Sequence, residues 1–124
     1  MDKHRILVVD DSQEIAVLLK AALDRTGHFT VQVERDPLKA QALARQFTPH
    51  LILMDIMMPN LDGGEHVSRL LADAQLGNPK IIFLSAAVTK EEVAAQGGVI
   101  GGRMILSKST SPREIVERIQ QALA

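Results

Sequence analysis

The chain has 124 residues, no cysteine and a formal charge of −1, from 14 basic and 15 acidic residues. Its length and its 46% hydrophobic content suit one domain, 1–124, with one core. The balanced charge gives no sign of direct binding to nucleic acid or an anionic membrane, and the lack of cysteine excludes disulfides. The apolar run near the N-terminus is too short for a signal peptide or a membrane span, so we expect a cytoplasmic protein.

The first part of the chain predicts two strands and two helices. Residues 6–9 form a short aliphatic run, which predicts a buried strand, whereas the alternation of apolar and polar residues over 29–33 predicts a less buried strand at an edge. Between them, Ser12 is a helix-capping residue, and Gly27 is placed to end the helix. A second helix is predicted within 36–49, because an Asp-Pro pair opens that stretch and a proline closes it.

The middle of the chain predicts a buried strand followed by an acid, a loop and a helix. Residues 51–54 are apolar throughout, as in parallel strands covered on both faces, and Asp55 follows them. Turn-forming residues lie between 59 and 63. Asp62 and the glutamate three residues later have the spacing of a helix capping box. The apolar stripe of this third helix is expected to extend to Ala74.

The last part predicts two more strands, over 81–84 and 104–106, and two more helices. Thr89 and the glutamate three residues later form a capping box that opens a short helix, and four glycines between 97 and 102 predict a looser segment. A Ser-Pro pair at 111–112 opens the last helix. Five strands alternating with five helices predict an α/β fold, with a parallel sheet covered by helices on both faces.

Polar side chains end four of the five predicted strands: Asp10, Asp11, Asp55, Ser85 and Lys108. Open α/β sheets bind ligands at the carboxyl ends of their strands, so we expect these side chains to lie together. Three close carboxylates repel one another and require a cation, and hard oxygen ligands suit Mg²⁺. Asp55 can then act as a nucleophile toward a phosphoryl donor, while Lys108 balances charge and Ser85 binds the transferred group.

Each of these residues also has a structural explanation when it is taken alone. Asp10 and Asp11 could cap a helix, and Asp55 could simply end a strand. Ser85 and Lys108 could be a turn hydroxyl and a solvated amine. Their joint placement at strand ends favours the site over these separate explanations.

The chain resembles the receiver domain of two-component response regulators over essentially its whole length. The resemblance rests on four motifs: Asp10-Asp11, Met54 to Gly63 with Asp55 at its head, Ser85-Ala86, and Lys108. It implies a flavodoxin-like, doubly wound (βα)5 fold with strand order 2-1-3-4-5. It also implies that Asp55 accepts a phosphoryl group from a histidine kinase or a histidine phosphotransfer protein.

The resemblance further implies a role for each site residue. Asp11, Asp55 and the backbone carbonyl of Met57 would ligate Mg²⁺, with Asp10 acting mainly through water. Small Ala86 would leave room for the phosphate beside Ser85 and Lys108. Phosphorylation would switch binding to an output partner, with a homodimer possible. Such a protein is a signalling phosphoacceptor rather than an enzyme, apart from its own phosphorylation and dephosphorylation.

Two positions depart from the family pattern. Ser109 stands where the family usually has a proline preceded by a cis peptide, and Ile105 stands where the family has an aromatic switch residue. Ser85 can still move on phosphorylation despite these changes. The response at Ile105 would differ from the family's, because Ile105 has no aromatic ring to swing. The resemblance therefore does not define how the output face, formed by the fourth helix, fifth strand and fifth helix, would transmit the signal.

Three other functions are weighed against the phosphoacceptor. A pseudo-receiver would bind partners without being phosphorylated, which Ser109 and Ile105 weakly favour and the complete acidic pocket disfavours. A metal-dependent phosphatase with an aspartyl nucleophile usually has a second acid where this chain has Met57. A dinucleotide-binding enzyme would need a glycine-rich turn after the first strand, which is absent.

Overall fold

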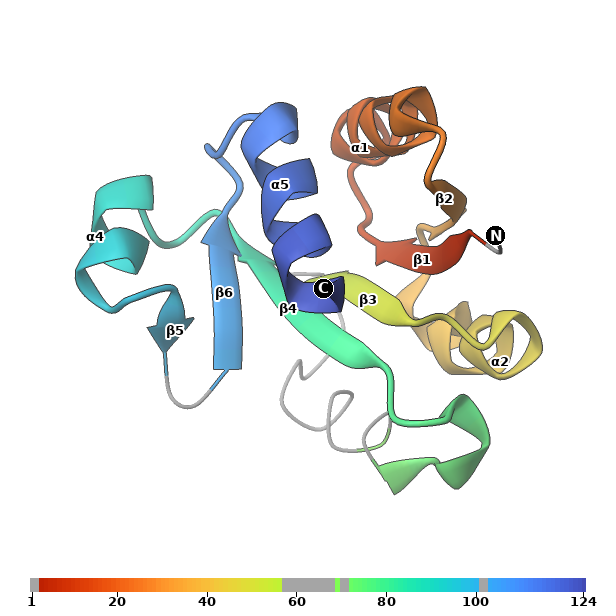
Figure 1. Cartoon of the computed structure of the whole chain (residues 1–124). Coiled ribbons are helices and arrows are strands. Elements are labelled where there is room, and N and C mark those ends of the chain that lie inside the picture. Colours follow the sequence, from red (N-terminus) through yellow and green to blue (C-terminus); the bar gives the residue numbers. More distant parts are fainter. Residues whose placement is uncertain (1–2, 57–68, 70–71, 101–102) are drawn as a thin grey trace.

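The computed structural model describes residues 3–56, 69, 72–100 and 103–124. Within these ranges, six strands form one sheet in the order β2-β1-β3-β4-β6-β5 (Figure 1). The strands are β1 His4–Val9, β2 Phe29–Glu34, β3 Leu51–Asp55, β4 Lys80–Ser85, β5 Val99–Ile100 and β6 Arg103–Ser107. All pairs are parallel except β5 with β6. The five predicted strands and their flavodoxin-like order 2-1-3-4-5 are confirmed, with β6 as the fifth.

The helices begin where the sequence places capping residues. The described helices are α1 Gln13–Thr26, α2 Pro37–Phe47, the 3₁₀ helix η1 Ala74–Leu76, α4 Lys90–Ala95 and α5 Pro112–Leu123. Ser12, Asp36, Thr89 and Ser111 each accept a backbone N–H from the first turn of the helix that follows. Gly27 ends α1 with a φ of 75°, in the left-handed region that glycine enters without steric cost.

The predicted third helix is described only in part. Its N-cap Asp62 lies outside the described residues, and Arg69 and Ala72 are helical. Ala74, expected on the stripe of that helix, lies instead in η1, so this expectation was wrong. The reason is Asp73, whose carboxylate accepts the N–H of Gln75 at 3.0 Å and thereby starts a new turn.

The glycine-rich segment before β6 contains a strand that the sequence did not predict. Gly97 and Gly98 have φ values of 68° and 80°, which turn the chain back after α4. Val99 then pairs antiparallel with Met104 of β6. The expected loose segment is therefore in part a short antiparallel addition to the sheet.

The sheet is buried on both faces, as the apolar strands predicted. Alternate residues of β1 face opposite sides, so that Ile6 packs with α1 and α5 whereas Leu7 packs with α2, η1 and α4. Figure 1 shows α1 and α5 on the same face of the sheet. No helix among the described residues is long and apolar enough to cross a membrane. The helices on both faces of the sheet thus hold the strand ends, which carry the site, in place.

Candidate functional site

The carboxyl ends of four neighbouring strands bring the predicted polar residues together. Asp10 follows β1, Asp55 ends β3, Ser85 ends β4 and Lys108 follows β6. These strands are adjacent in the sheet in the order β1-β3-β4-β6. Because parallel strands end at the same edge, side chains that are far apart in the sequence meet there.

Lys108 forms the centre of this cluster. Its Nζ lies 2.9 Å from Asp55 Oδ2 and 3.0 Å from Asp10 Oδ2. The Asp10 and Asp55 side chains are 0% and 1% exposed, and that of Lys108 is 14% exposed. One ammonium thus faces two buried carboxylates, and the exposed carboxylate of Asp11 adds a third negative charge. The site carries an excess of negative charge that a cation can balance.

Asp10 has one oxygen that is only partly satisfied. Its Oδ1 accepts the N–H of Ser12 at 2.9 Å and a hydrogen bond from Lys108 Nζ at 3.2 Å. Its buried Oδ2 is in ion-pair range of Nζ but accepts no aligned hydrogen bond among the described residues. Burial raises the pKa of Asp10, the Ser12 N–H and Lys108 oppose that rise, and the charge of Asp55 adds to it.

The carboxylates and burial have opposite effects on the pKa of Lys108. Burial alone would lower the pKa of Lys108, but its hydrogen bonds to Asp55 and Asp10 outweigh that effect and raise the pKa above 10.5. Lys108 is therefore a fixed positive charge at neutral pH. It can balance charge on a bound anion without giving up a proton.

The three acids fit a hard divalent cation. Asp10, Asp11 and Asp55 each offer an oxygen, and these oxygens lie within 4.8 Å of one another. Two oxygens on opposite sides of one Mg²⁺ are about 4.2 Å apart, so the carboxylates stand close to the required spacing. Among the described residues, Asp10 Oδ2 accepts no aligned hydrogen bond, so it has a lone pair that a cation could take. The predicted ligand Met57 lies outside the described residues.

Ser85 and Ala86 border the same edge. Ser85 is 2% exposed, and its Oγ accepts the N–H of Ala87 at 3.0 Å. Ala86 is exposed. Asp55 is paired in register with Leu84, so Ser85 lies one residue beyond it on the neighbouring strand.

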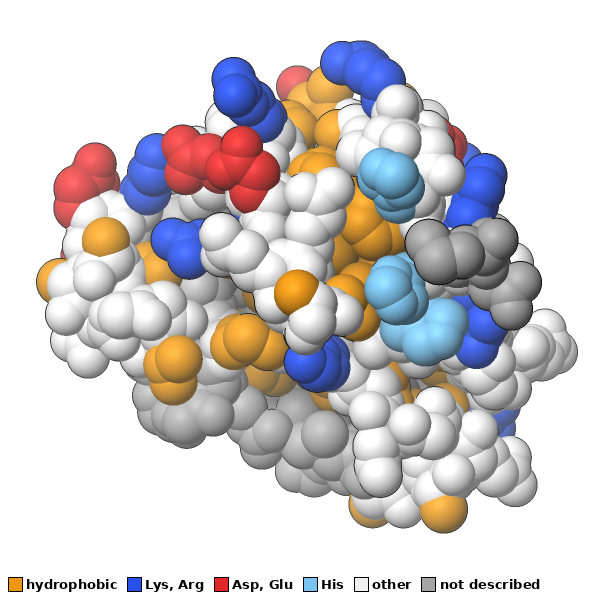
Figure 2. Space-filling model, viewed as in Figure 1, with side chains coloured by type: hydrophobic (Ala, Val, Ile, Leu, Met, Phe, Trp, Pro, Cys, Tyr) orange, Lys and Arg blue, Asp and Glu red, His pale blue; other side chains and the backbone are white. Residues whose placement is uncertain are grey.

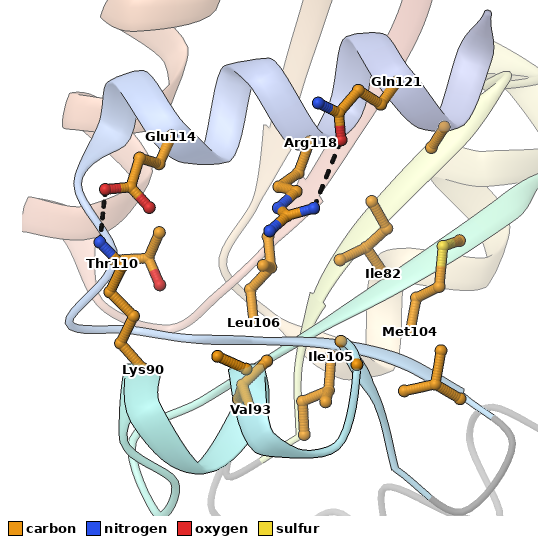
Figure 3. A pocket seen from close by; sticks show the side chains of 15 residues that line it. Ile82, Lys90, Val93, Met104, Ile105, Leu106, Thr110, Glu114, Arg118 and Gln121 are labelled. Carbon is orange, nitrogen blue, oxygen red and sulfur yellow. Dashed lines mark hydrogen bonds and ion pairs between the residues drawn. The ribbon is translucent and has the colours of Figure 1, made fainter.

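Ile105 lies inside the core rather than at the acidic edge. It is 8% exposed and packs in the layer with α2, η1 and α4, while its N–H donates to Gly98 O at 3.0 Å. The Lys108–Ser109 peptide is trans. Ile105, the predicted switch residue, therefore packs against α4 and lines one wall of a groove (Figure 3).

That groove is separate from the carboxylates. It lies between α4, β6 and α5, has a volume of about 510 Å³, and is lined mainly by apolar residues such as Val93 and Leu106. At its rim, Lys90 Nζ pairs with Glu114 Oε1 at 2.5 Å (Figure 3). Its lining includes neither the acids nor Lys108. The charged side chains of the site therefore lie at the polar edge and not in this groove.

One feature of the site was missed at the sequence level. Ser107 is 2% exposed, and its hydroxyl bonds to Ser109 next to Lys108. The sequence does show that four of the five residues from 107 to 111, all except Lys108, carry hydroxyl groups. Serine is typical of the first position of a β-turn, where its hydroxyl bonds to the backbone two residues on.

Comparisons with known proteins agree with this arrangement. The family model for the response regulator receiver domain matches residues 6–120. Protein PilH of Pseudomonas aeruginosa is 33% identical over 97% of this chain and 98% of that protein. The DNA-binding dual master transcriptional regulator RpaA of Synechocystis is 33% identical over 96% of this chain. The chain spans about half of that regulator, 48% of its length.

Solved structures give the same fold. Chemotaxis protein CheY4 of Vibrio cholerae matches with a TM-score of 0.79 and 25% identity, over 97% of this chain and 98% of that chain. With the sheet order and the acidic edge already described, these matches define the class of protein. The chain belongs to the response regulator receiver domain family of two-component signalling.

Proposed function

We propose that this receiver domain is a phosphoacceptor and that Asp55 is its phosphorylation site. The observation that supports this most directly is the Asp55 carboxylate, 1% exposed and 2.9 Å from Lys108 Nζ, beside two further acids. The donor is a sensor histidine kinase or a histidine phosphotransfer protein. Mg²⁺ held by Asp10, Asp11 and Asp55, with the Met57 carbonyl as a further ligand, would neutralise charge on the carboxylates and on the phosphoryl oxygens.

The chemical step is a phosphoryl transfer between two side chains. An oxygen of the Asp55 carboxylate forms a bond to phosphorus while the P–N bond to the donor imidazole breaks. The bonding electrons leave with the imidazole nitrogen, which then takes a proton from solvent. Lys108 stays protonated and pairs with a phosphoryl oxygen, as its raised pKa requires. The same site would later direct water to the phosphorus, so its only turnover is its own phosphorylation and dephosphorylation.

The transferred group changes the charge at the edge of the sheet. A phosphoryl group brings about 1.5 to 2 negative charges and three acceptor oxygens. Ser85 and Lys108 would bind those oxygens, with Ala86 leaving room for them. Movement of Ser85, together with repacking at Ile105, would pass the change to the groove between α4, β6 and α5.

The partners follow from this role. Residues 1–124 act as a single cytoplasmic signalling domain that switches binding to an output partner, directly or as a homodimer. The relative RpaA is described as DNA-binding, but this chain spans only about half of it. With a formal charge of −1, this domain would not itself bind nucleic acid.

Incubation with acetyl phosphate and Mg²⁺ tests the proposal. We expect intact-mass spectrometry to show a gain of one phosphoryl group in wild type, none in Asp55→Asn, and none when EDTA removes the metal. Asp36→Asn is a control for an acid outside the site, since Asp36 caps α2. No added mass in a folded wild type, or equal labelling of Asp55→Asn, would instead support the pseudo-receiver.

A further inference from the structure

The turn after β6 carries a pair of hydroxyls beside Lys108. Ser107 Oγ accepts the N–H of Ser109 at 3.1 Å and lies 2.8 Å from Ser109 Oγ. Ser107 O accepts the N–H of Thr110 at 3.0 Å. Residues 107–110 thus form a β-turn closed by its first residue through both the carbonyl and the side chain. Lys108 is the second residue of this turn.

The same turn is tied to the neighbouring strand. Lys108 N–H donates to Ser85 O at 3.0 Å, and Ser107 lies opposite Ser85 in the β4–β6 register. Ser107 itself is 2% exposed, so water does not compete freely for its hydroxyl. The backbone of Lys108 is therefore held by β4 on one side and by the Ser107 side chain on the other.

Lys108 needs such support because its side chain is intrinsically mobile. A lysine ammonium is a point charge on a four-carbon stem that has no preferred plane of contact. Its Nζ must nevertheless stay 2.9 Å from Asp55 Oδ2 and 3.0 Å from Asp10 Oδ2. No proline stiffens residues 107–110, so the hydrogen bonds of Ser107 define the shape of the turn.

We propose that Ser107 is a positioning residue that acts through Lys108, with the Ser109 hydroxyl as its support. The effect on phosphorylation rests on the proposed function, whereas the effect on Lys108 does not. A hydroxyl that served stability alone would lower the free energy of unfolding when removed and leave the Lys108 side chain in place. The two roles therefore differ in what happens to Lys108.

The test compares four variants with wild type. Ser107→Ala removes the hydroxyl, Ser107→Thr restores it, and Ser109→Ala removes only the supporting side chain. Thr26→Ala is a matched control, because Thr26 Oγ1 accepts the N–H of His28, also two residues on, at 3.1 Å. Two quantities are measured: the order of the Lys108 ε-carbon by ¹³C NMR relaxation in the unphosphorylated protein, and the rate of phosphorylation by acetyl phosphate at saturating Mg²⁺.

We expect Ser107→Ala to disorder the Lys108 ε-carbon and to slow phosphorylation about tenfold, because misplaced reacting groups lose rate steeply. Ser107→Thr should keep both quantities near wild type, and Ser109→Ala should have a smaller effect. Thr26→Ala should change neither. Unchanged Lys108 order in Ser107→Ala, or an equal change in Thr26→Ala, would overturn the proposal. If wild type takes no phosphoryl group, the proposed function fails, and the order of Lys108 still decides the role of Ser107.

Discussion

The two ends of the sheet use polar side chains in opposite ways. At the amino end, His50 Nδ1 accepts the backbone N–H of Arg5 at 2.8 Å, and Arg5 Nε donates to the carbonyls of Phe47 and Thr48 at 3.0 and 2.9 Å. Each of these polar groups has a backbone partner. At the carboxyl end, the charged side chains face one another, and Asp10 Oδ2 accepts no aligned hydrogen bond within the described part of the chain.

The difference separates a structural use of polarity from a chemical one. At the amino end, the bonds of Arg5 and His50 to backbone groups hold loops in place. Arg5 holds Thr48, for example, at a φ of 46°, where a β-branched residue is unfavourable. The three histidines of the described region, His4, His28 and His50, lie at or just before the starts of β1, β2 and β3. Figure 2 shows histidine side chains gathered on one face of the molecule. The ligand-binding capacity lies at the other end.

The largest expected effect is the loss of Lys108. Lys108→Ala leaves Asp10 and Asp55 buried without their counter-charge, and we expect the free energy of unfolding to fall by about 3 kcal/mol. Urea unfolding followed by far-UV circular dichroism measures it, since the chain has no tryptophan or tyrosine for fluorescence. Lys90→Ala breaks an ion pair whose side chains are 52% and 41% exposed, and should cost less than about 0.5 kcal/mol. Equal losses in the two variants would contradict the expectation that the buried ion pairs of Lys108 matter more for stability than the exposed pair of Lys90.

Metal binding should stabilise the carboxyl end. At a free Mg²⁺ concentration ten times Kd, we expect wild type to gain about 1.4 kcal/mol in the free energy of unfolding. Asp11→Asn should lose most of this gain and little else, because Asp11 is exposed. Asp24→Asn, which removes an exposed acid paired with Lys20, should retain it. A gain that survives Asp11→Asn would place the metal elsewhere.

At the amino end, Arg5→Lys should affect stability without affecting chemistry. A lysine cannot reproduce the guanidinium contacts with the Phe47 and Thr48 carbonyls, and we expect a loss of about 1 kcal/mol. The phosphorylation rate with acetyl phosphate should equal that of wild type. A slower rate in Arg5→Lys would show that the two ends of the sheet are coupled.

The smallest effect is a pH dependence from His50. Burial first, and then the charges of Arg5 and His4, lower the pKa of His50 below 6.5. The unfolded chain therefore takes up a proton that the folded chain resists, so the free energy of unfolding should fall as the pH drops below about 6.5, by a few tenths of a kcal/mol (~0.5) over one pH unit. His50→Asn keeps an acceptor that does not titrate and should flatten the curve. Parallel curves for both proteins from pH 7 to 5.5 would contradict this.

Much of the fold and of the site could be predicted from local patterns. Apolar runs identified five strands, and the caps Ser12, Asp36, Thr89 and Ser111 located the starts of four helices. The proximity of Asp10, Asp55 and Lys108 could be predicted from the topology alone, because parallel strands end at the same edge of the sheet. Their roles in phosphorylation stay predictions until labelling is measured.

The features that escaped prediction depend on short segments and on tertiary contacts. The two residues of β5 are too few for a periodic pattern, and their pairing depends on the left-handed turn at Gly97 and Gly98. The end of the third helix was misplaced because Asp73 bonds across the fold to Gln41 and Arg45, at 2.9 and 2.6 Å, while it caps η1. No pattern within one helix encodes such a contact.

The short strand β5 also bears on solubility. Unpaired backbone groups along the edge of a sheet can pair with the edge of another molecule and so start aggregation. In this protein Val99 covers the outer side of β6 at Met104, and Gly98 O takes the N–H of Ile105. Two residues are too few to offer a new edge of useful length. Strand β5 thus covers the first part of β6, the strand that leads into Lys108, against pairing with a neighbouring molecule.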